Sequence, residues 1–201
     1  MRKLILLTFL TLDGVMQAPG GPEEDQSGGF KYGGWSTPLW DDELNAVMAE
    51  QMGHPFDLLL GRKTYDIFAG AWPTLDPESA INSSRKYVVT HRPIPPDTEV
   101  WKNSVRVDGD VPAEIKKIKA EDGPEIQVHG SSDMLQTLLK HDLVDELWLK
   151  IFPVTLGAGK RLFGEGAIAK AFALTDSQVS PSGVTVANYV RKGAVETGSF
   201  E

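Results

Sequence analysis

The sequence contains no cysteine among its 201 residues. Disulfides, a thiol nucleophile and cysteine-ligated metal sites are therefore excluded. The chain also lacks an excess of positive charge, since its formal net charge is −8 at pH 7 and its pI is near 5.0. An acidic chain is a poor partner for nucleic acid or for an anionic membrane surface. We therefore expect a small-molecule substrate as the partner, with no nucleic acid and no membrane involved.

The sequence has no apolar run of the roughly 20 residues that a membrane-spanning helix needs. The apolar segment after Arg2-Lys3 resembles a signal peptide in its basic start and apolar centre. It runs directly into Asp13-Gly14 without a small-residue cleavage site, which favours a buried first strand instead. We expect a cytoplasmic protein.

Several catalytic signatures are absent as well. The four histidines follow no metal-binding spacing, so no metal site is expected, and no G-x-S-x-G elbow supplies a serine nucleophile. A G-x-G-x-x-G turn does not follow the first strand, which argues against the classical dinucleotide fold. Residues 153–163 resemble a P-loop, but Val154 replaces its first glycine and Arg161 replaces its magnesium-binding Ser or Thr.

The pattern of apolar residues alternates between strand-like and helix-like segments within a length typical of one domain. This predicts an α/β fold with a mixed, mostly parallel sheet, helices on both faces and a C-terminal antiparallel hairpin. We expect one domain over residues 1–192 and a flexible tail over 193–201, with an irregular stretch at 70–82. Strands are expected at 3–12, 57–60, 86–90, within 100–107, and at 126–129, 146–152, 172–179 and 184–191.

Residues 14–38 form a long segment rich in glycine and proline that carries the acidic run Glu23-Glu24-Asp25. Loops of this length inside a compact domain are uncommon and are often lids or binding loops. We interpret the segment as an active-site loop. A disordered insertion is the alternative.

Three predicted strands end in glycine, hydroxyl or basic residues. Glycine lets a backbone approach a phosphate, N–H groups at a helix start bind it, and Arg or Lys supplies charge. Because ligands bind at the carboxyl ends of parallel strands, three such ends suit a dinucleotide with an extra ribose phosphate, which is NADPH. The cofactor-binding candidates are Gly61, Arg62, Lys63, Thr64, Thr90, His91, Arg92, His129, Gly130, Ser131 and Ser132.

A reductase also needs a proton source and a substrate pocket. Asp13, at the end of the first strand and the mouth of the long loop, is the candidate catalytic carboxylate. A simple turn residue before Gly14 is the alternative. Trp40 and Asp41 open the helix after the loop and are substrate-binding candidates, although helix capping explains Asp41 equally well.

Five segments in order resemble the dihydrofolate reductase-like superfamily: TLDG at 11–14, LLLGRKTYDIF at 58–68, VTHRP at 89–93, IQVHGSSDML at 126–135 and PVTLGAGKRLF at 153–163. More narrowly, the chain resembles stand-alone relatives of the reductase domain of the bifunctional riboflavin-biosynthesis deaminase–reductase. The resemblance implies an eight-stranded mixed sheet, NADPH as cofactor and often a homodimer.

The resemblance also distributes the roles of individual residues. It implies that residues 61–64 lie by the cofactor phosphates, 90–92 at the adenosine ribose and its phosphate, and 130–132 at the pyrophosphate. Asp13 and residues 156–159 would border substrate and nicotinamide, which adds Leu156 and Gly157 as substrate-binding residues and Gly159 as a cofactor-binding one. Dihydrofolate reductases usually have a Gly-Gly pair where this chain has His129-Gly130. The zinc-binding deaminase domain is absent from this sequence.

Two functions follow as hypotheses. The first is an NADPH-dependent reductase of a pterin-, aminopyrimidine- or related small heterocyclic substrate. The second is a nucleotide-binding module that keeps the fold without turnover.

Overall fold

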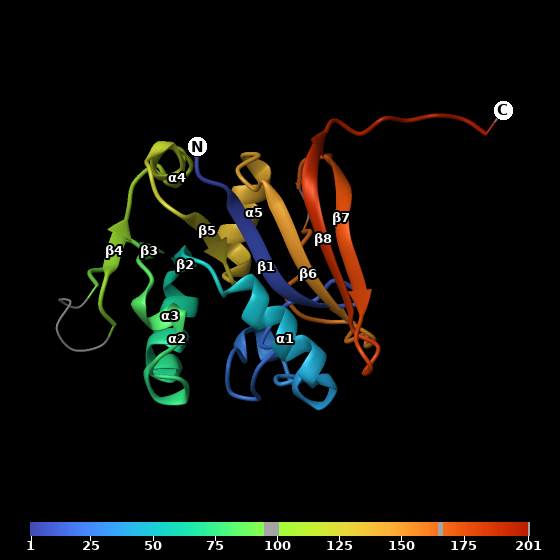
Figure 1. Ribbon diagram of the computed structural model, residues 1–201, viewed down its shortest axis with the longest axis horizontal. Coiled ribbons are helices and arrows are strands. Elements are labelled where there is room, and N and C mark those ends of the chain that lie inside the picture. Colours follow the sequence, from blue (N-terminus) through green and yellow to red (C-terminus); the bar gives the residue numbers. More distant parts are fainter. Residues whose placement is uncertain (95–100, 165–166, 201) are drawn as a thin grey trace.

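The computed structural model describes residues 1–94, 101–164 and 167–200, and its centre is one twisted sheet (Figure 1). Within the described residues the sheet has eight strands in the order β4-β3-β2-β5-β1-β6-β8-β7. The pairs from β4 to β6 are parallel, and β8 pairs antiparallel with both β6 and β7. The strands are β1 (Leu4–Thr11), β2 (Phe56–Gly61), β3 (Lys86–Val89), β4 (Ser104–Val107), β5 (Glu125–Val128), β6 (Glu146–Phe152), β7 (Ala171–Val179) and β8 (Thr185–Gly193). The predicted mixed, mostly parallel sheet with a C-terminal hairpin is confirmed.

Helices cover both faces of this sheet, as predicted (Figure 1). Alternate side chains of a strand point to opposite faces, so β1 sends Leu6 toward one helix layer and Phe9 toward the other. On the first face lie α4 (Val111–Ala120) and α5 (Ser132–Lys140). On the second lie α1 (Asp42–Gln51), α2 (Arg62–Leu75) and the short α3 (Ala80–Ser83).

The irregular stretch predicted at 70–82 is wrong. α2 continues through Pro73 to Leu75, and α3 follows it after four residues. Pro73 has no N–H to donate to the Ala69 carbonyl, yet the helix continues for two more residues. The Asn82 side chain donates to the carbonyls of Trp72 at 3.2 Å and Asp76 at 2.8 Å, which are among the carbonyls that a helix C-terminus leaves without intrahelical partners.

The long segment 14–38 is packed against the body of the protein, which overturns the alternative of a disordered insertion. Val15, Phe30 and Trp35 are buried with Phe152 of β6 in one apolar cluster. The indole N–H of Trp35 donates to the carbonyl of Gln17 at 2.7 Å. Short 3-10 turns at Ser27–Gly29 and Thr37–Leu39 give the segment local structure.

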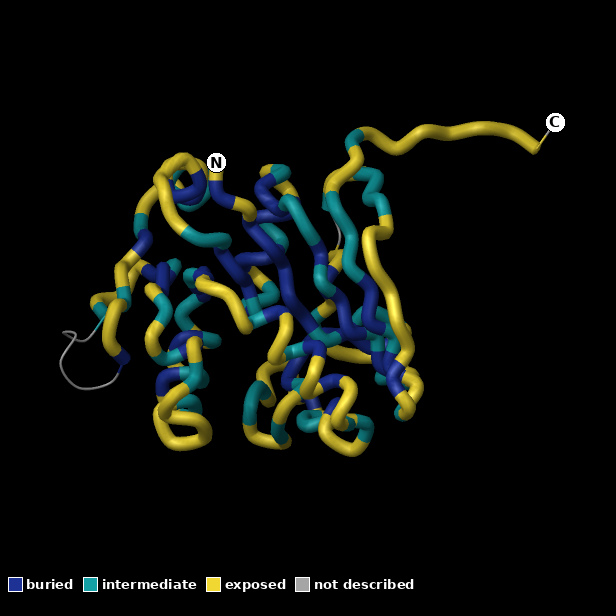
Figure 2. The backbone as a smooth tube through the Cα atoms, in the orientation of Figure 1, coloured by how far each residue is buried: buried dark blue, intermediate teal, exposed yellow. Residues whose placement is uncertain are grey.

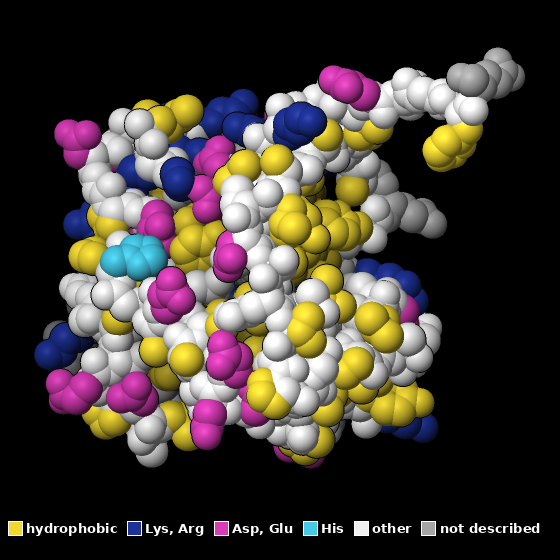
Figure 3. Space-filling view, turned by 45° about the vertical axis from the view of Figure 1, so that its right-hand side comes forward, with side chains coloured by type: hydrophobic (Ala, Val, Ile, Leu, Met, Phe, Trp, Pro, Cys, Tyr) yellow, Lys and Arg dark blue, Asp and Glu magenta, His cyan; other side chains and the backbone are white. Residues whose placement is uncertain are grey.

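The edge of the sheet formed by β7 exposes apolar surface. In Figure 3, which brings the β7–β8 side forward, hydrophobic side chains gather over this side, below the C-terminal segment. Leu174 and Val179 of β7 are among the exposed apolar residues. After β8, residues 194–200 are exposed and extend away from the body (Figures 1 and 2). Of the helices in the described ranges, none has the length and apolar character required to cross a bilayer.

Candidate active site

The ends of β2 and β5 meet at the centre of the sheet. The backbone N–H of Gly61 donates to the Ser131 hydroxyl at 2.7 Å, and that hydroxyl donates to Thr64 at 2.8 Å. A side chain on Gly61 would place its Cβ only 2.6 Å from the Ser131 oxygen, so this approach requires glycine. Two of the three predicted phosphate-binding segments are therefore side by side, with α2 and α5 both beginning at this point.

The third segment lies next to them, because β3 is the neighbour of β2. Arg62 links the two strand ends by donating to the carbonyl of Pro93 at 2.9 Å. The hydroxyl of Thr90 accepts a bond from the backbone N–H of Arg92 at 3.1 Å, which shapes the turn after β3. His91 lies 2.6 Å from Asp108, on the neighbouring strand end. The predicted row of three strand ends along one edge is thus present.

Arg92 stands out among the cations of this row. Its side chain is exposed, and no group in the described ranges accepts a hydrogen bond from its guanidinium. By contrast, Arg62 is held by Asp66 at 2.8 Å, one turn along α2. Among the contacts of residues 1–94, 101–164 and 167–200, nothing engages the guanidinium of Arg92, which makes it the candidate of the row for a ligand contact.

The Asp13 side chain anchors the loop after β6. Its carboxylate accepts hydrogen bonds from the Thr11 hydroxyl at 2.5 Å, the Gly157 N–H at 2.8 Å and the Leu156 N–H at 3.2 Å. Led by the bond from Thr11, these contacts lower the pKa of Asp13 to about 2. Asp13 is therefore ionised at neutral pH. Asp13 holds residues 156–157 in place. A catalytic role for Asp13 stays a prediction.

Close packing explains why residue 159 is a glycine. Its φ is +121°, and an added Cβ would lie 2.7 Å from Val15 and 2.8 Å from the ring of Phe30. Val15 also forms an antiparallel bridge with Arg161. The 156–161 loop and the start of segment 14–38 are thus packed together, a contact that no local pattern in the sequence indicates.

Trp40 and Asp41 are both engaged in local structure. The Asp41 carboxylate caps α1 by accepting from the Leu44 N–H at 3.0 Å, and it also accepts from the Ser182 N–H at 3.0 Å. The bond from Leu44 leads the contacts that lower the pKa of Asp41 to about 2. The indole of Trp40 donates to Asn45 at 2.8 Å. Capping thus accounts for Asp41, and contact of either residue with substrate stays a prediction.

Sequence reasoning missed a buried polar chain on the face of the sheet that α1 covers. The fully buried ammonium of Lys150 donates to the side chain of Gln51. Gln127 donates to the Gln51 carbonyl at 2.9 Å, and its own side-chain oxygen lies 2.8 Å from His129. Burial lowers the pKa of Lys150 to about 7. The single lysine in the apolar segment LWLKIF was the signal available in the sequence.

His129 belongs to this chain of contacts. Burial, and secondarily the charge of Lys150, lower the pKa of His129 to about 3. Its ring packs on Phe56 with centroids 6.3 Å apart and contacts Phe68 edge-on. A neutral imidazole in this setting supplies no positive charge to a phosphate, so any cofactor contact of His129 is through its ring or its backbone.

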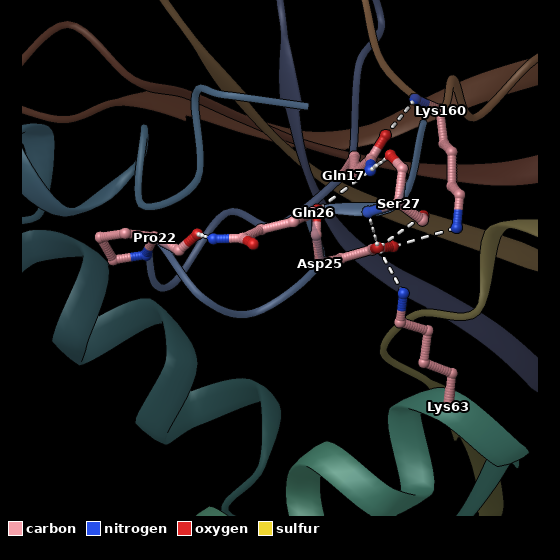
Figure 4. A network of polar contacts seen from close by, with 7 residues as sticks. All are labelled: Gln17, Pro22, Asp25, Gln26, Ser27, Lys63 and Lys160. Atoms are coloured by element: carbon pink, nitrogen blue, oxygen red, sulfur yellow. Dashed lines mark hydrogen bonds and ion pairs between the residues drawn. The ribbon is translucent and has the colours of Figure 1, made fainter. Parts of the chain in front are cut away.

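Segment 14–38 contacts the row of strand ends through Asp25 (Figure 4). Lys63, the second residue of α2, forms an ion pair with the Asp25 carboxylate, and Lys160 forms another at 3.0 Å. Gln17 fixes the arrangement by donating to the Asp25 carbonyl at 3.0 Å and accepting from the Lys160 N–H at 3.0 Å. Across residues 1–94, 101–164 and 167–200, no group of three or more histidine or acidic side chains is arranged to hold a metal ion.

The fold is a layered α/β fold in which three parallel strands end in glycine, hydroxyl or basic residues along one edge. The family model of the RibD C-terminal domain matches residues 2–186, and the chain belongs to that family. It is 28% identical over 173 residues to the uncharacterised protein YyaP of Bacillus subtilis strain 168, covering 81% of this chain and 80% of the relative. It is 26% identical over 166 residues to the uncharacterised protein YwjB of the same organism, covering 82% and 84%.

Solved structures agree with the family. A protein from Shewanella sp. PV-4, described as a candidate riboflavin biosynthesis protein, matches with TM-score 0.71 at 24% identity over 96% of this chain and 99% of that one. A pyrimidine reductase-like protein from Corynebacterium diphtheriae matches with TM-score 0.63 at 14% identity, over 95% and 92%. Dihydrofolate reductase from Enterococcus faecalis, complexed with NADP(H) and RAB-propyl, matches with TM-score 0.58 at 16% identity, over 94% and 96%. These similarities confirm the dihydrofolate reductase-like fold.

Proposed function

We propose that the protein is an NADPH-dependent reductase of a pterin-, aminopyrimidine- or related small heterocyclic substrate. The observation that carries the proposal is the row of three strand ends, at Gly61, Thr90 and Gly130, along one edge of the sheet. The fold similarity to a dihydrofolate reductase complexed with NADP(H) and to a pyrimidine reductase-like protein supports it. When bound, NADPH supplies the hydride.

The residues of the row fit a cofactor with several phosphates. Gly130 has no side chain, so the backbone at the start of the β5–α5 turn is uncovered. An added Cβ there would lie 3.5 Å from Thr64. The N-terminal ends of α2 and α5 contribute the positive ends of two helix dipoles. The exposed guanidinium of Arg92 suits the ribose phosphate that distinguishes NADPH from NADH.

The protein's own residues orient the reactants. Asp13 holds the N–H groups of Leu156 and Gly157 and thereby fixes the loop beside the site. Because Asp13 is ionised at neutral pH, the proton that a reduction consumes reaches the substrate from another group or from water.

The cofactor assignment is tested by binding. NADPH and NADH are titrated against the protein by nucleotide fluorescence and by thermal stability, with the expectation that NADPH binds more tightly. Arg92→Ala should weaken NADPH about tenfold or more and leave NADH unchanged, since a charge-assisted phosphate contact is lost. Arg85→Ala is the matched control, because Arg85 precedes β3 at the opposite end of the strand. Equal weakening of NADH would place Arg92 outside the ribose-phosphate site.

Turnover separates the reductase from the second candidate, a nucleotide-binding module. The observation that favours the module is that Asp13 and Asp41 are both held ionised by structural hydrogen bonds. NADPH oxidation is followed with a panel of pterins and aminouracils. Oxidation with any member supports the reductase, and tight NADPH binding without oxidation by any of them supports the module.

We also propose that two copies of the chain associate, as the family resemblance implies. The exposed Leu174 and Val179 on the edge strand β7 make that edge the first place to test. Sedimentation velocity at two concentrations measures the state of association, and a monomer at both concentrations would contradict the proposal.

A further inference from the structure

The Asp25 carboxylate lies between two lysines that come from distant parts of the chain (Figure 4). Lys63 is near the start of α2 and pairs with one oxygen, while Lys160 lies 3.0 Å from the other. The Ser27 hydroxyl donates to the same carboxylate at 2.6 Å, and the Ser27 N–H donates at 3.0 Å. Four donors from three segments therefore converge on a single anion.

The surroundings favour a negative charge at this point. The Asp25 side chain is only 12% exposed. Burial alone would raise its pKa, but the bonds from Lys63, Ser27 and Lys160 outweigh this and hold the pKa well below its usual range. A phosphate group has the same sign of charge and more acceptor oxygens, so it satisfies these donors at least as well as a carboxylate.

We propose that Lys63 and Lys160 form a phosphate-binding site, and that Asp25 occupies this site as an internal substitute until a ligand phosphate displaces it. The proposal rests on the proposed function for the identity of that ligand, which is the cofactor or a phosphorylated substrate. It assigns Lys160 a ligand contact, and it makes the Asp25 side chain the group that moves when ligand binds.

The displacement is physically accessible. The side chain of Lys63 is 53% exposed and that of Lys160 is 33% exposed, so an incoming group reaches both from solvent. The position of Lys63 beside Gly61 and Thr64 places it in the row of strand ends that the cofactor phosphates would follow. Gln17 holds the backbone at residues 25 and 27, which leaves the Asp25 side chain as the group that competes.

Removing the competitor should tighten phosphate binding. If the site is occupied by Asp25 for nine-tenths of the time or more, its removal raises the apparent affinity about tenfold or more. Asp25→Asn is compared with Glu23→Gln, which removes the same charge from the same segment. Glu23 is exposed and bonds to Gln26, with no ion pair to Lys63 or Lys160. The control thus accounts for the general change in charge.

The probes are NADPH, ribose 5-phosphate and inorganic pyrophosphate, each titrated by isothermal calorimetry. We expect Asp25→Asn to bind pyrophosphate at least about fivefold more tightly than the unaltered protein, with Glu23→Gln unchanged. A matching gain for NADPH assigns the site to the cofactor, and a gain for ribose 5-phosphate alone assigns it to a substrate. The double variant Asp25→Asn, Lys160→Gln should lose the gain.

The outcomes separate this inference from the proposed function. Tighter pyrophosphate binding by Asp25→Asn with no NADPH binding by any variant supports the phosphate site and overturns the cofactor. If Asp25→Asn binds none of pyrophosphate, ribose 5-phosphate and NADPH more tightly than the unaltered protein, and the unaltered protein binds NADPH, the inference is overturned and the cofactor stands. Weaker NADPH binding by this variant would mean that Asp25 closes over a bound ligand, and it also overturns the inference. Hydrogen exchange at the Ser27 amide adds a structural readout, because displacement of the Asp25 carboxylate by pyrophosphate removes the hydrogen bond of this amide and should accelerate its exchange.

Discussion

The Ser131 hydroxyl accepts a hydrogen bond from the backbone of Gly61 at 2.7 Å, and this contact joins the ends of β2 and β5. Ser131 adopts a left-handed conformation with φ of 78°, which turns its side chain toward the neighbouring strand end. The two segments predicted to bind phosphate thus form one surface, and its geometry depends on the lack of a side chain at Gly61.

Gly61→Ala should destabilise the protein and Gly130→Ala should not. The new Cβ at residue 61 would lie 2.6 Å from the Ser131 oxygen and 2.7 Å from its Cβ. At residue 130 it would lie 3.5 Å from Thr64, an ordinary contact. We expect a loss of about 1–3 kcal/mol for Gly61→Ala, as for other overpacked sites. Urea denaturation measures both, and equal stability of the two variants would contradict the close approach.

Asp13→Asn should loosen the loop after β6. The variant weakens the hydrogen bonds to Leu156 and Gly157, and we expect it to lose roughly 1–2 kcal/mol at pH 7. Because the fold lowers the pKa of Asp13 from 3.8 to about 2, its contribution is complete above about pH 4 and disappears as the pH falls toward 2. The difference in unfolding free energy between the protein and the variant should shrink over that range.

The activity of Asp13→Asn gives a separate readout. An anchoring role predicts a raised KM and a pH–rate profile that keeps its shape, since Asp13 does not titrate near neutral pH. A profile that loses an acid-side limb between pH 5 and 8 in the variant would instead show that Asp13 exchanges a proton during turnover.

Lys150→Met should stabilise the protein near neutral pH. The fold lowers the pKa of Lys150 from 10.5 to about 7, so the buried ammonium opposes folding below pH 7 and this cost fades as the pH rises to 10.5. Methionine of similar length removes the charge, and a gain of about 1–3 kcal/mol is expected even though Gln51 loses its partner. The stability advantage of the variant should shrink between pH 7 and 10.

Lys119→Met is the contrasting control for that experiment. Lys119 is also buried, but it pairs with Asp145 at 2.5 Å and donates to the Leu143 carbonyl at 2.7 Å. Its removal takes the buried cation from Asp145, which keeps only the more exposed Arg191 at 3.1 Å, and deprives the Leu143 carbonyl of this donor. The variant should therefore be less stable than the unaltered protein. Equal destabilisation by Lys150→Met would contradict the prediction. It would show that the contacts of the Lys150 ammonium stabilise the fold, as those of Lys119 do.

Much of the fold could be predicted because local patterns specify it. Continuous apolar segments indicated the strands, and the periodic Leu135, Leu138 and Leu139 indicated the buried face of α5. The helix through Pro73 was missed because its stability comes from packing of Phe68 and Trp72 and from the Asn82 cap, which no local rule displays.

By itself, the sequence determined the layered α/β fold and the glycine, hydroxyl and basic residues at three strand ends, because strand period and glycine turns are local properties. The tertiary structure decided the strand order that brings these ends to one edge. Tertiary structure decided what the polar groups do there. In the folded protein, Asp13 and Asp41 accept hydrogen bonds from backbone N–H groups. Lys150 is buried beside Gln51, and Asp25 lies between Lys63 and Lys160. These contacts join residues far apart in the chain, so their ionisation and partners follow only from the packing of the folded protein.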